Sequence, residues 1–203
     1  MLARNGTWQT PTLTGLRDGQ RIQPDIPTER RKWLPPRMLQ IDSAGYRVDP
    51  GGGSRYPPQY LLQQRLIPML ARAGVPILAG SDVPGTRRVP GQSLVEELET
   101  LVSAGLTPLE AVRSATLNPA RFLGLTDSLG SVAPGKVADL VLLEGNPLAD
   151  ITALRRVQAV VAAGRYYSRE DLDRRLGEVQ ALLGRLRAIA APIVAGAGAP
   201  SSR

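Results

Sequence analysis

The 203-residue sequence contains no histidine and no cysteine, and aromatic residues make up only 4% of it. Without imidazole or thiolate side chains, the chain lacks the usual ligands of a zinc site and can form no disulfide framework. The missing disulfides fit a reducing compartment, so we expect a cytoplasmic protein. We expect no membrane span either, because the longest uncharged tract, residues 188–202, is short and interrupted by proline and glycine.

Lysine is also scarce. The 25 basic residues comprise 23 arginines and only Lys32 and Lys136, and with 18 acidic residues the formal net charge is +7. A basic chain is a candidate for binding nucleic acid or another anionic surface. The arginines are scattered in short pairs, however, and no aromatic residues are interleaved with them. We therefore expect solvated arginines and no specific nucleic-acid partner.

The first half of the chain predicts a loop, a helix and a strand. Residues 15–58 are interrupted by seven prolines and a run of three glycines, which favours a long irregular loop. A helix is predicted from Tyr60 to Ala73, with Pro68 kinking or restarting it. Val75–Ala79 is apolar at every position, which is typical of a parallel strand buried on both faces.

The middle of the chain shows three helix starts. Ser93 and Glu96 match a capping box, which predicts a helix that ends at Gly105. Residues 107–110, Thr-Pro-Leu-Glu, match a second box with proline at the first helical position. A third, short helix is predicted from Asn118 to Gly124. These helices are expected to serve packing rather than chemistry.

The C-terminal part predicts two strands and a long helix. Ala138–Leu143 and Val157–Ala163 are expected to pair, with Gly164 closing the second strand. A helix from Glu170 to about Ala188 carries an apolar stripe at Leu172, Leu176, Val179, Leu183 and Leu186. We favour docking of this stripe on its own chain over a partner helix, and we expect the Ala/Gly/Pro/Ser tail after residue 190 to be disordered.

Several segments follow one another in an order shared with known enzymes. The matching pieces are residues 75–82 (Val-Pro-Ile-Leu-Ala-Gly-Ser-Asp), 104–111, 115–120, 130–143 and 160–165. Together they resemble the metal-dependent amidohydrolase superfamily, especially its imidazolonepropionase-like and prolidase-like members. The set covers much of the chain and is more specific than any single motif.

The resemblance implies an α/β fold: the C-terminal part of a (β/α)8 TIM barrel, about strands seven and eight with their helices, plus a remnant of a small β-sandwich domain. The implied division is residues 1–125 for the partial barrel, 126–166 for the partial sandwich, 167–190 for a C-terminal helix and 191–203 for the tail. Asn5–Leu13 is similar to the family's seventh strand. Trp33 and Tyr46 become candidate walls of a substrate pocket, and open strand edges are expected in the sandwich.

Asp82 is the one candidate for both a catalytic and a metal-binding role. In the family the aspartate after the eighth strand binds a divalent metal, and we expect zinc in the full-length family; it also helps to activate a water. The family's histidine ligands are absent here, and Val95 stands where many relatives carry histidine. Since a catalytic zinc takes about three protein ligands, we expect no metal bound by this chain alone. Without the resemblance, Gly-Ser-Asp after a strand is more often a turn or a helix cap.

Two other features are weaker candidates for a catalytic role. Asp139 also matches the family, and we interpret it as a structural residue that bonds within the sandwich turn. Gly85–Arg88 offers arginines next to Asp82 that could meet an acidic substrate group, although a solvated loop is the preferred interpretation.

The implied function is hydrolysis of a carbon–nitrogen bond other than a peptide bond in a small-molecule substrate. We expect this chain to be truncated and inactive alone. The alternative is a non-catalytic scaffold that completes its barrel with a partner chain or as a homo-oligomer. A third and least favoured hypothesis is an anion-binding module that uses the arginines.

Overall fold

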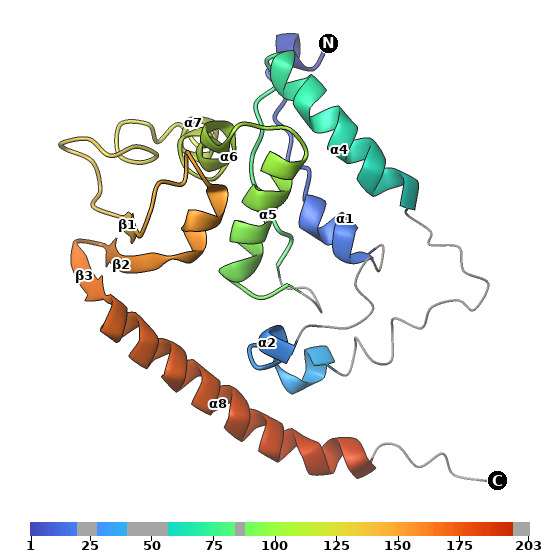
Figure 1. Ribbon diagram of the computed structural model, residues 1–203, viewed down its shortest axis with the longest axis vertical. Helices are drawn as coiled ribbons and strands as arrows, with labels where there is room; N and C mark the ends of the chain where they lie inside the picture. Colours follow the sequence, from blue (N-terminus) through green and yellow to red (C-terminus); the bar gives the residue numbers. More distant parts are fainter. Residues whose placement is uncertain (20–27, 40–56, 84–87, 197–203) are drawn as a thin grey trace.

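Helices dominate the described part of the chain, which comprises residues 1–19, 28–39, 57–83 and 88–196 of the computed structural model (Figure 1). In chain order the helices are α1 (Leu13–Gly19), α2 (Thr28–Arg31), α4 (Pro57–Arg72), α5 (Gln92–Ser103), α6 (Pro108–Ala115), α7 (Leu117–Phe122) and α8 (Arg169–Gly196). Short 3-10 turns are η1 (Ala3–Asn5) and η2 (Ile151–Arg155). The strands β1 (Leu140–Leu143), β2 (Val157–Ala162) and β3 (Arg165–Ser168) form one sheet in the order β1-β2-β3. The fold is therefore mixed α/β, as the sequence predicted.

α5 is the centre of the core. It packs against α1, α6 and η2, and Figure 1 shows it between α1 and α4 on one side and α6, α7 and the sheet on the other. The buried cluster around it includes Leu13, Ile67, Ile77, Leu101 and Ala111. Each belongs to a different segment, so the core joins parts of the chain that lie far apart in the sequence.

α4 begins three residues earlier than predicted and ends one residue sooner. It starts at Pro57, where the fixed φ of proline suits a first helical turn, and it continues through Pro68 to Arg72 as one helix. Of the two predicted alternatives, a kink or a restart at Pro68, the restart is therefore wrong. Ile67 is 1% exposed and Leu70 packs on the core, so tertiary packing outweighs the backbone hydrogen bond lost at the proline.

The predicted strand at Val75–Ala79 is reduced to a single parallel bridge between Ile77 and Gln9. The amide of Gln9 donates to the Pro76 carbonyl at 3.0 Å, and the Leu78 amide donates to the Gln9 carbonyl at 2.8 Å. Val75 and Ile77 are buried, whereas Pro76 and Leu78 are half-buried. Burial on both faces was thus a wrong prediction, because only one face of this segment lies against the core.

The predicted loop at residues 15–58 is wrong where the structure describes it. Most of α1 and all of α2 fall within this range, and residues 36–39 form another helical turn. Trp33 packs against the buried pair Leu34 and Val89, so it belongs to a small apolar cluster. Residues 20–27 and 40–56, with the second candidate wall residue Tyr46, lie outside the described residues.

Of the two predicted capping boxes, one is confirmed and one is wrong. At α6 the Thr107 side chain accepts from the Glu110 amide, and the Glu110 carboxylate accepts from the Thr107 amide at 2.7 Å. At α5, however, the N-cap is Gly91, and Ser93 already lies inside the helix. Its hydroxyl donates to the Ser81 hydroxyl instead. A long-range partner has replaced the local one.

The predicted pairing of Ala138–Leu143 with Val157–Ala163 is present as β1 and β2, and β3 is a strand that the sequence did not predict. β1 and β2 pair antiparallel, and Ala163 and Gly164 turn the chain into β3 with φ values of 49° and 76°. The Asp139 carboxylate accepts a 2.6 Å hydrogen bond from the Ala163 amide, which confirms its structural role. No further described strand pairs with the outer edge of β1, where Val141 is 59% exposed, so the expected open edge is present.

α8 extends diagonally away from the sheet in Figure 1 and reaches the neighbourhood of α2. There the Arg187 guanidinium donates to the carbonyls of Arg31 and Leu34. Within the predicted apolar stripe Leu183 is buried, but Leu176, Val179 and Leu186 are more than 40% exposed. The favoured docking of the stripe on its own chain is therefore met only in part.

The helix also continues to Gly196, so the tail predicted to be disordered is helical over residues 191–196. Residues 197–203 lie outside the described residues. Among the described helices, none combines the length and the apolar character that a membrane span requires.

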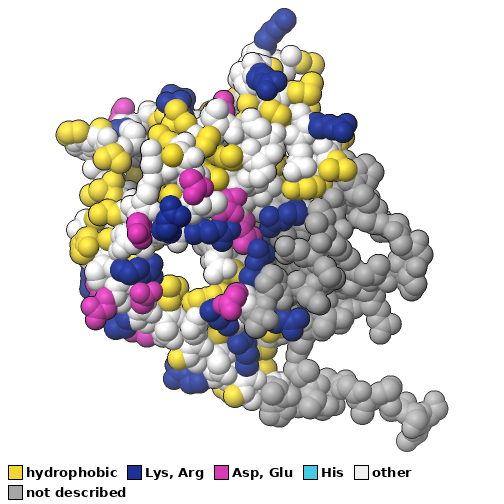
Figure 2. All heavy atoms as spheres, viewed as in Figure 1, with side chains coloured by type: hydrophobic (Ala, Val, Ile, Leu, Met, Phe, Trp, Pro, Cys, Tyr) yellow, Lys and Arg dark blue, Asp and Glu magenta, His cyan; other side chains and the backbone are white. Residues whose placement is uncertain are grey.

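Basic and acidic side chains are intermixed on the face shown in Figure 2, around a hollow in its middle. Several of these charges form pairs that join distant segments, such as Arg155 with Glu99 at 2.6 Å. Arg155 is thus paired, although the sequence predicted solvated arginines. That the chain has no specific nucleic-acid partner stays a prediction.

The capping box at Thr107 leads to a pH-dependent prediction. Its hydrogen bonds from Thr107 hold the pKa of Glu110 below the ordinary value of 4.5. A group whose pKa is lowered by folding contributes stability above its unfolded pKa and loses it as the pH falls through the folded pKa. We expect wild type to exceed Glu110→Gln in stability by less than about 1 kcal/mol at pH 7, and the difference to vanish under acid.

Urea denaturation between pH 7 and pH 3 measures this difference. The matched control is Glu170→Gln, at an exposed position at the start of α8. A difference between wild type and Glu110→Gln that stays constant down to pH 3 would contradict the prediction.

Candidate functional site

Asp82 stands where the Val75–Ala79 segment has ended and the chain turns. Its φ of 52° is in the left-handed region, which aspartate tolerates better than most residues. The side chain is 78% exposed. The turn therefore presents the carboxylate to solvent rather than burying it in a cap.

Arg88 holds this turn. Its Nε donates to the Asp82 carbonyl at 3.0 Å, and its Nη2 lies 3.4 Å from the Asp82 Oδ2. The arginine side chain is only 16% exposed, and it has room because residue 15 is glycine: a Cβ there would lie 3.1 Å from the Arg88 Nη1. The solvated loop expected at Gly85–Arg88 is thus wrong for Arg88, while residues 84–87 lie outside the described residues.

Just before Asp82, Gly80 packs closely against Thr10, which follows Gln9 in the segment before α1. A Cβ on Gly80 would lie 2.5 Å from the Cγ2 of Thr10, so only glycine fits there without displacing Thr10. On the other side, the Ser81 hydroxyl accepts from Ser93 at 3.1 Å, which ties the turn to the first residues of α5. Asp82 is therefore positioned by α5 and by the segment before α1.

A buried carboxylate, Glu97 on α5, fixes the start of α1. It accepts hydrogen bonds from the Leu13 amide at 2.8 Å, the Thr14 amide at 2.7 Å and the Thr14 hydroxyl at 2.8 Å. These donors include amides of the first helical turn, which have no partner within a helix. Burial raises the pKa of the Glu97 carboxyl, and the three hydrogen bonds and the charge of Arg17 oppose that rise.

Its neighbour Glu96 binds two arginines from the N-terminal part of the chain. The Oε1 of Glu96 lies 2.7 Å from Arg30, and its Oε2 lies 3.3 Å from Arg17. Glu96 was predicted to belong to a cap, and Glu97 was not identified from the sequence. A signal was available, because Glu97 stands four residues before the core residue Leu101 and so lies on the buried face of α5.

The described residues do not fit a divalent metal by themselves. In the described part of the chain, no three histidine, cysteine, aspartate or glutamate residues come close enough to hold an ion. A catalytic zinc takes about three protein ligands, and Asp82 supplies one carboxylate whose recorded ionic partner is Arg88. A metal site at Asp82 therefore requires further ligands.

The region around this site matches a known family. A model described as "Amidohydrolase family" matches residues 63–166, just over half of the 203 residues. The match begins within α4, includes Asp82 and Arg88, and ends in β3. The segments quoted from the sequence fall almost entirely within it.

Curated relatives match a shorter part of the chain. The adenine deaminase of Nitratidesulfovibrio vulgaris (strain DP4) is 47% identical over 73 residues, which is 36% of this chain and 12% of that protein. The imidazolonepropionase of Geobacillus kaustophilus (strain HTA426) is 42% identical over 74 residues, 36% of this chain and 17% of that protein. The matches thus span less than a fifth of each of these relatives.

Solved structures match more of the chain. A bottromycin amidohydrolase superposes with a TM-score of 0.69 and 25% identity, over 88% of this chain and 41% of that one. The likeness extends beyond the residues matched by the family model. The chain therefore spans well under half the length of this solved relative.

Removing the buried carboxylate should loosen the support of the site. In Glu97→Gln the amide NH2 would face a backbone N–H donor, and we expect a loss of about 1–3 kcal/mol in the free energy of unfolding. The matched control is Glu99→Gln on the same helix, which removes a partly exposed pair with Arg155 and should cost less than about 1 kcal/mol.

Urea denaturation measures the loss, and hydrogen exchange at the Leu13 and Thr14 amides locates it. Equal losses in the two variants, or unchanged exchange at those amides, would show that Glu97 does not hold α1.

Proposed function

Since this chain belongs to the amidohydrolase family, we propose that it forms part of a metal-dependent hydrolase that cleaves carbon–nitrogen bonds other than peptide bonds. The observation that carries the proposal is Asp82, an exposed carboxylate within the matched region at the end of a segment bridged in parallel to Gln9. The proposed substrate is a small molecule with an amide-like or imide-like bond. The names of the adenine deaminase and the imidazolonepropionase are consistent with that class.

The architecture that we propose is the C-terminal part of a (β/α)8 barrel. The Gln9 and Val75–Ala79 segments would be its seventh and eighth strands, and β1–β3 would be part of a small β-sandwich domain. The parallel bridge and the superposition over 88% of the chain support this assignment. In such barrels the catalytic residues follow the carboxyl ends of the strands, which is the position of Asp82.

Asp82 would act as a general base. Its carboxylate is exposed and can accept a proton from the water that attacks the substrate carbon. Arg88 would keep the carboxylate and its backbone in place through the Asp82 carbonyl. We also propose that Asp82 is a ligand of a divalent metal, zinc in the full-length family, with the other ligands supplied from outside these 203 residues.

The test uses the protein as its native cells make it. We expect Asp82→Asn to lower kcat for hydrolysis of small amides and imides by about a hundredfold or more, because it removes the proton acceptor. The control is Asp127→Asn, at an exposed position that is outside the proposed site. Full activity of Asp82→Asn would refute the role of Asp82.

A second candidate function, a non-catalytic scaffold, rests on surfaces without a partner in the described chain. Val141 at the outer edge of β1 and Leu176 and Val179 on α8 are 44–59% exposed. An open sheet edge can pair with another strand. In this alternative the 21.7 kDa chain is the mature product and completes its fold with a partner chain or with its own copies.

Intact mass separates the two candidates. A species clearly larger than 21.7 kDa, detected in native cells with an antibody to residues 172–186, supports the hydrolase. A 21.7 kDa species supports the scaffold.

The scaffold predicts a defined assembly through the edge of β1. Val141→Lys should then lower the mass measured by size exclusion with light scattering, because a lysine on the edge opposes strand pairing. Val132→Lys, at a position that is 85% exposed and outside the sheet, should leave that mass unchanged. A monomeric or heterogeneously aggregated chain would count against the scaffold.

A further inference from the structure

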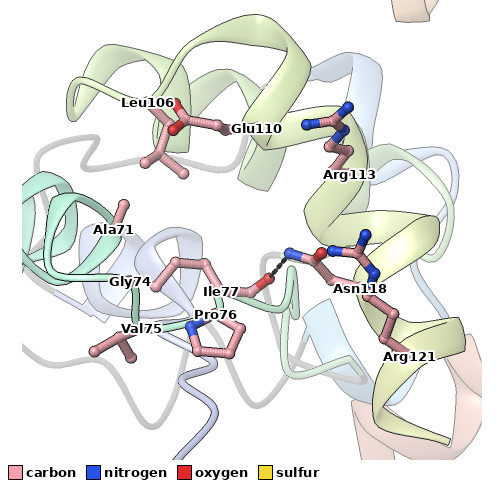
Figure 3. Close-up of a pocket in the computed structure, with 10 residues that line it drawn as sticks. All are labelled: Ala71, Gly74, Val75, Pro76, Ile77, Leu106, Glu110, Arg113, Asn118 and Arg121. Carbon is pink, nitrogen blue, oxygen red and sulfur yellow. Dashed lines mark hydrogen bonds between the residues drawn. The ribbon is translucent and has the colours of Figure 1, made fainter. Parts of the chain in front are cut away.

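A cavity of about 240 Å³ lies at the opposite end of the Val75–Ala79 segment from Asp82 (Figure 3). Its wall is mixed, and the apolar part includes Ala71, Val75, Ile77 and Leu106. Asp82 is not among the residues that line it. The cavity therefore belongs neither to the proposed catalytic site nor to its supporting contacts.

Two arginines stand on one side of this cavity. Figure 3 shows Arg113 of α6 and Arg121 of α7 beside Asn118, across from Ile77. Both side chains are exposed, and no recorded hydrogen bond or salt bridge within the described residues engages either guanidinium. The charge of Arg113 lies near enough to Glu110 to help lower the pKa of that carboxyl, but in the described part of the chain neither arginine forms an ion pair like those with Glu96.

The cavity has one acidic residue, Glu110, against two arginines, so its lining carries a net positive charge. Figure 3 shows Glu110 beside Leu106 rather than beside Arg121, and its carboxylate is occupied by the amide and hydroxyl of Thr107 at 2.7 and 2.8 Å. Two positive groups against one negative group leave a charge of one, which suits a monoanion. A polyanion such as a nucleic-acid backbone would find little positive charge and a partly apolar wall.

The backbone adds a hydrogen-bond donor. The Asn118 Nδ2 donates to the Ile77 carbonyl at 2.8 Å. In an extended chain the N–H and C=O groups of one residue point to the same side, so the Ile77 amide also points toward Asn118 and the cavity. That amide has no recorded partner among the described residues, although Ile77 is only 5% exposed. A ligand oxygen in the cavity would satisfy this donor.

We propose that this cavity is a binding site for a small carboxylate with an apolar body. The carboxylate would lie toward Arg113 and Arg121, and the apolar body would lie against Ala71, Val75 and Leu106. At about 30 Å³ for each water-sized group, the volume holds roughly eight such groups, which corresponds to a short-chain acid. The proposal does not depend on the catalytic role of Asp82.

Hexanoate, with its six carbons and two oxygens, is a matched probe, and 1-hexanol is its uncharged counterpart. In a titration of the ¹⁵N-labelled 203-residue chain, we expect hexanoate to cause saturable shifts at the Ile77 amide and the Asn118 side-chain amide. We expect 1-hexanol to bind at least about fivefold more weakly, because it lacks the charge-assisted hydrogen bonds. No saturable shift, or equal binding of the two probes, would overturn the proposal.

Variants test whether the two arginines bind the carboxylate of hexanoate. Arg121→Gln and Arg113→Gln should each weaken hexanoate binding by about fivefold while leaving 1-hexanol binding unchanged. Arg65→Gln, at an exposed position on α4 outside the cavity, is the control and should bind hexanoate as wild type does. The retained 1-hexanol shifts show that each variant is folded. Equal hexanoate affinity in all three variants would show that Arg113 and Arg121 do not bind the carboxylate.

Inorganic phosphate is the final comparison. Because it has no apolar body, we expect it to bind at least about fivefold more weakly than hexanoate at the same ionic strength. Phosphate binding as tight as that of hexanoate would overturn the role assigned to the apolar wall.

Discussion

The contact on which the arrangement around Asp82 most depends is the buried carboxylate of Glu97 at the start of α1. Three donors from Leu13 and Thr14 converge on it. Removing one partner of a buried hydrogen bond leaves the other unsatisfied, so this contact determines where α1 begins. The segment that precedes α1 contains Gln9 and packs against Gly80 through Thr10, immediately before Asp82. A glutamate that performs no chemistry in our proposal therefore positions the residue that does.

The two ends of the Val75–Ala79 segment carry opposite charges. At its carboxyl end Asp82 presents an exposed carboxylate next to Arg88, and at its amino end Arg113 and Arg121 stand beside a partly apolar cavity. In our proposals the first end is part of a catalytic site, and the second binds a small anion. Family membership follows from the match over residues 63–166, while the activity of the complete protein remains our proposal because the chain spans a minor part of its relatives.

Elements with local causes were predicted well. The capping box at Thr107 uses groups three residues apart, and the pairing of β1 with β2 joins two apolar runs that each read as a strand. Errors arose where distant groups compete. α1 falls in a stretch that looked like a loop because its cap comes from Glu97, more than eighty residues away. Ser93 matched a cap but binds Ser81 instead. Asp82 was identified from the sequence, whereas its partner Arg88 was expected in a solvated loop.

The sequence by itself determined the family, the position of Asp82 and the lack of histidine ligands, since order, spacing and composition are properties of the chain alone. Only the tertiary structure decided which charges meet. Arg88 turns to Asp82, and Arg17 and Arg30 bind Glu96. The physical reason is that an ion pair or a buried hydrogen bond depends on distance and burial after folding, and neither can be read from separation along the chain.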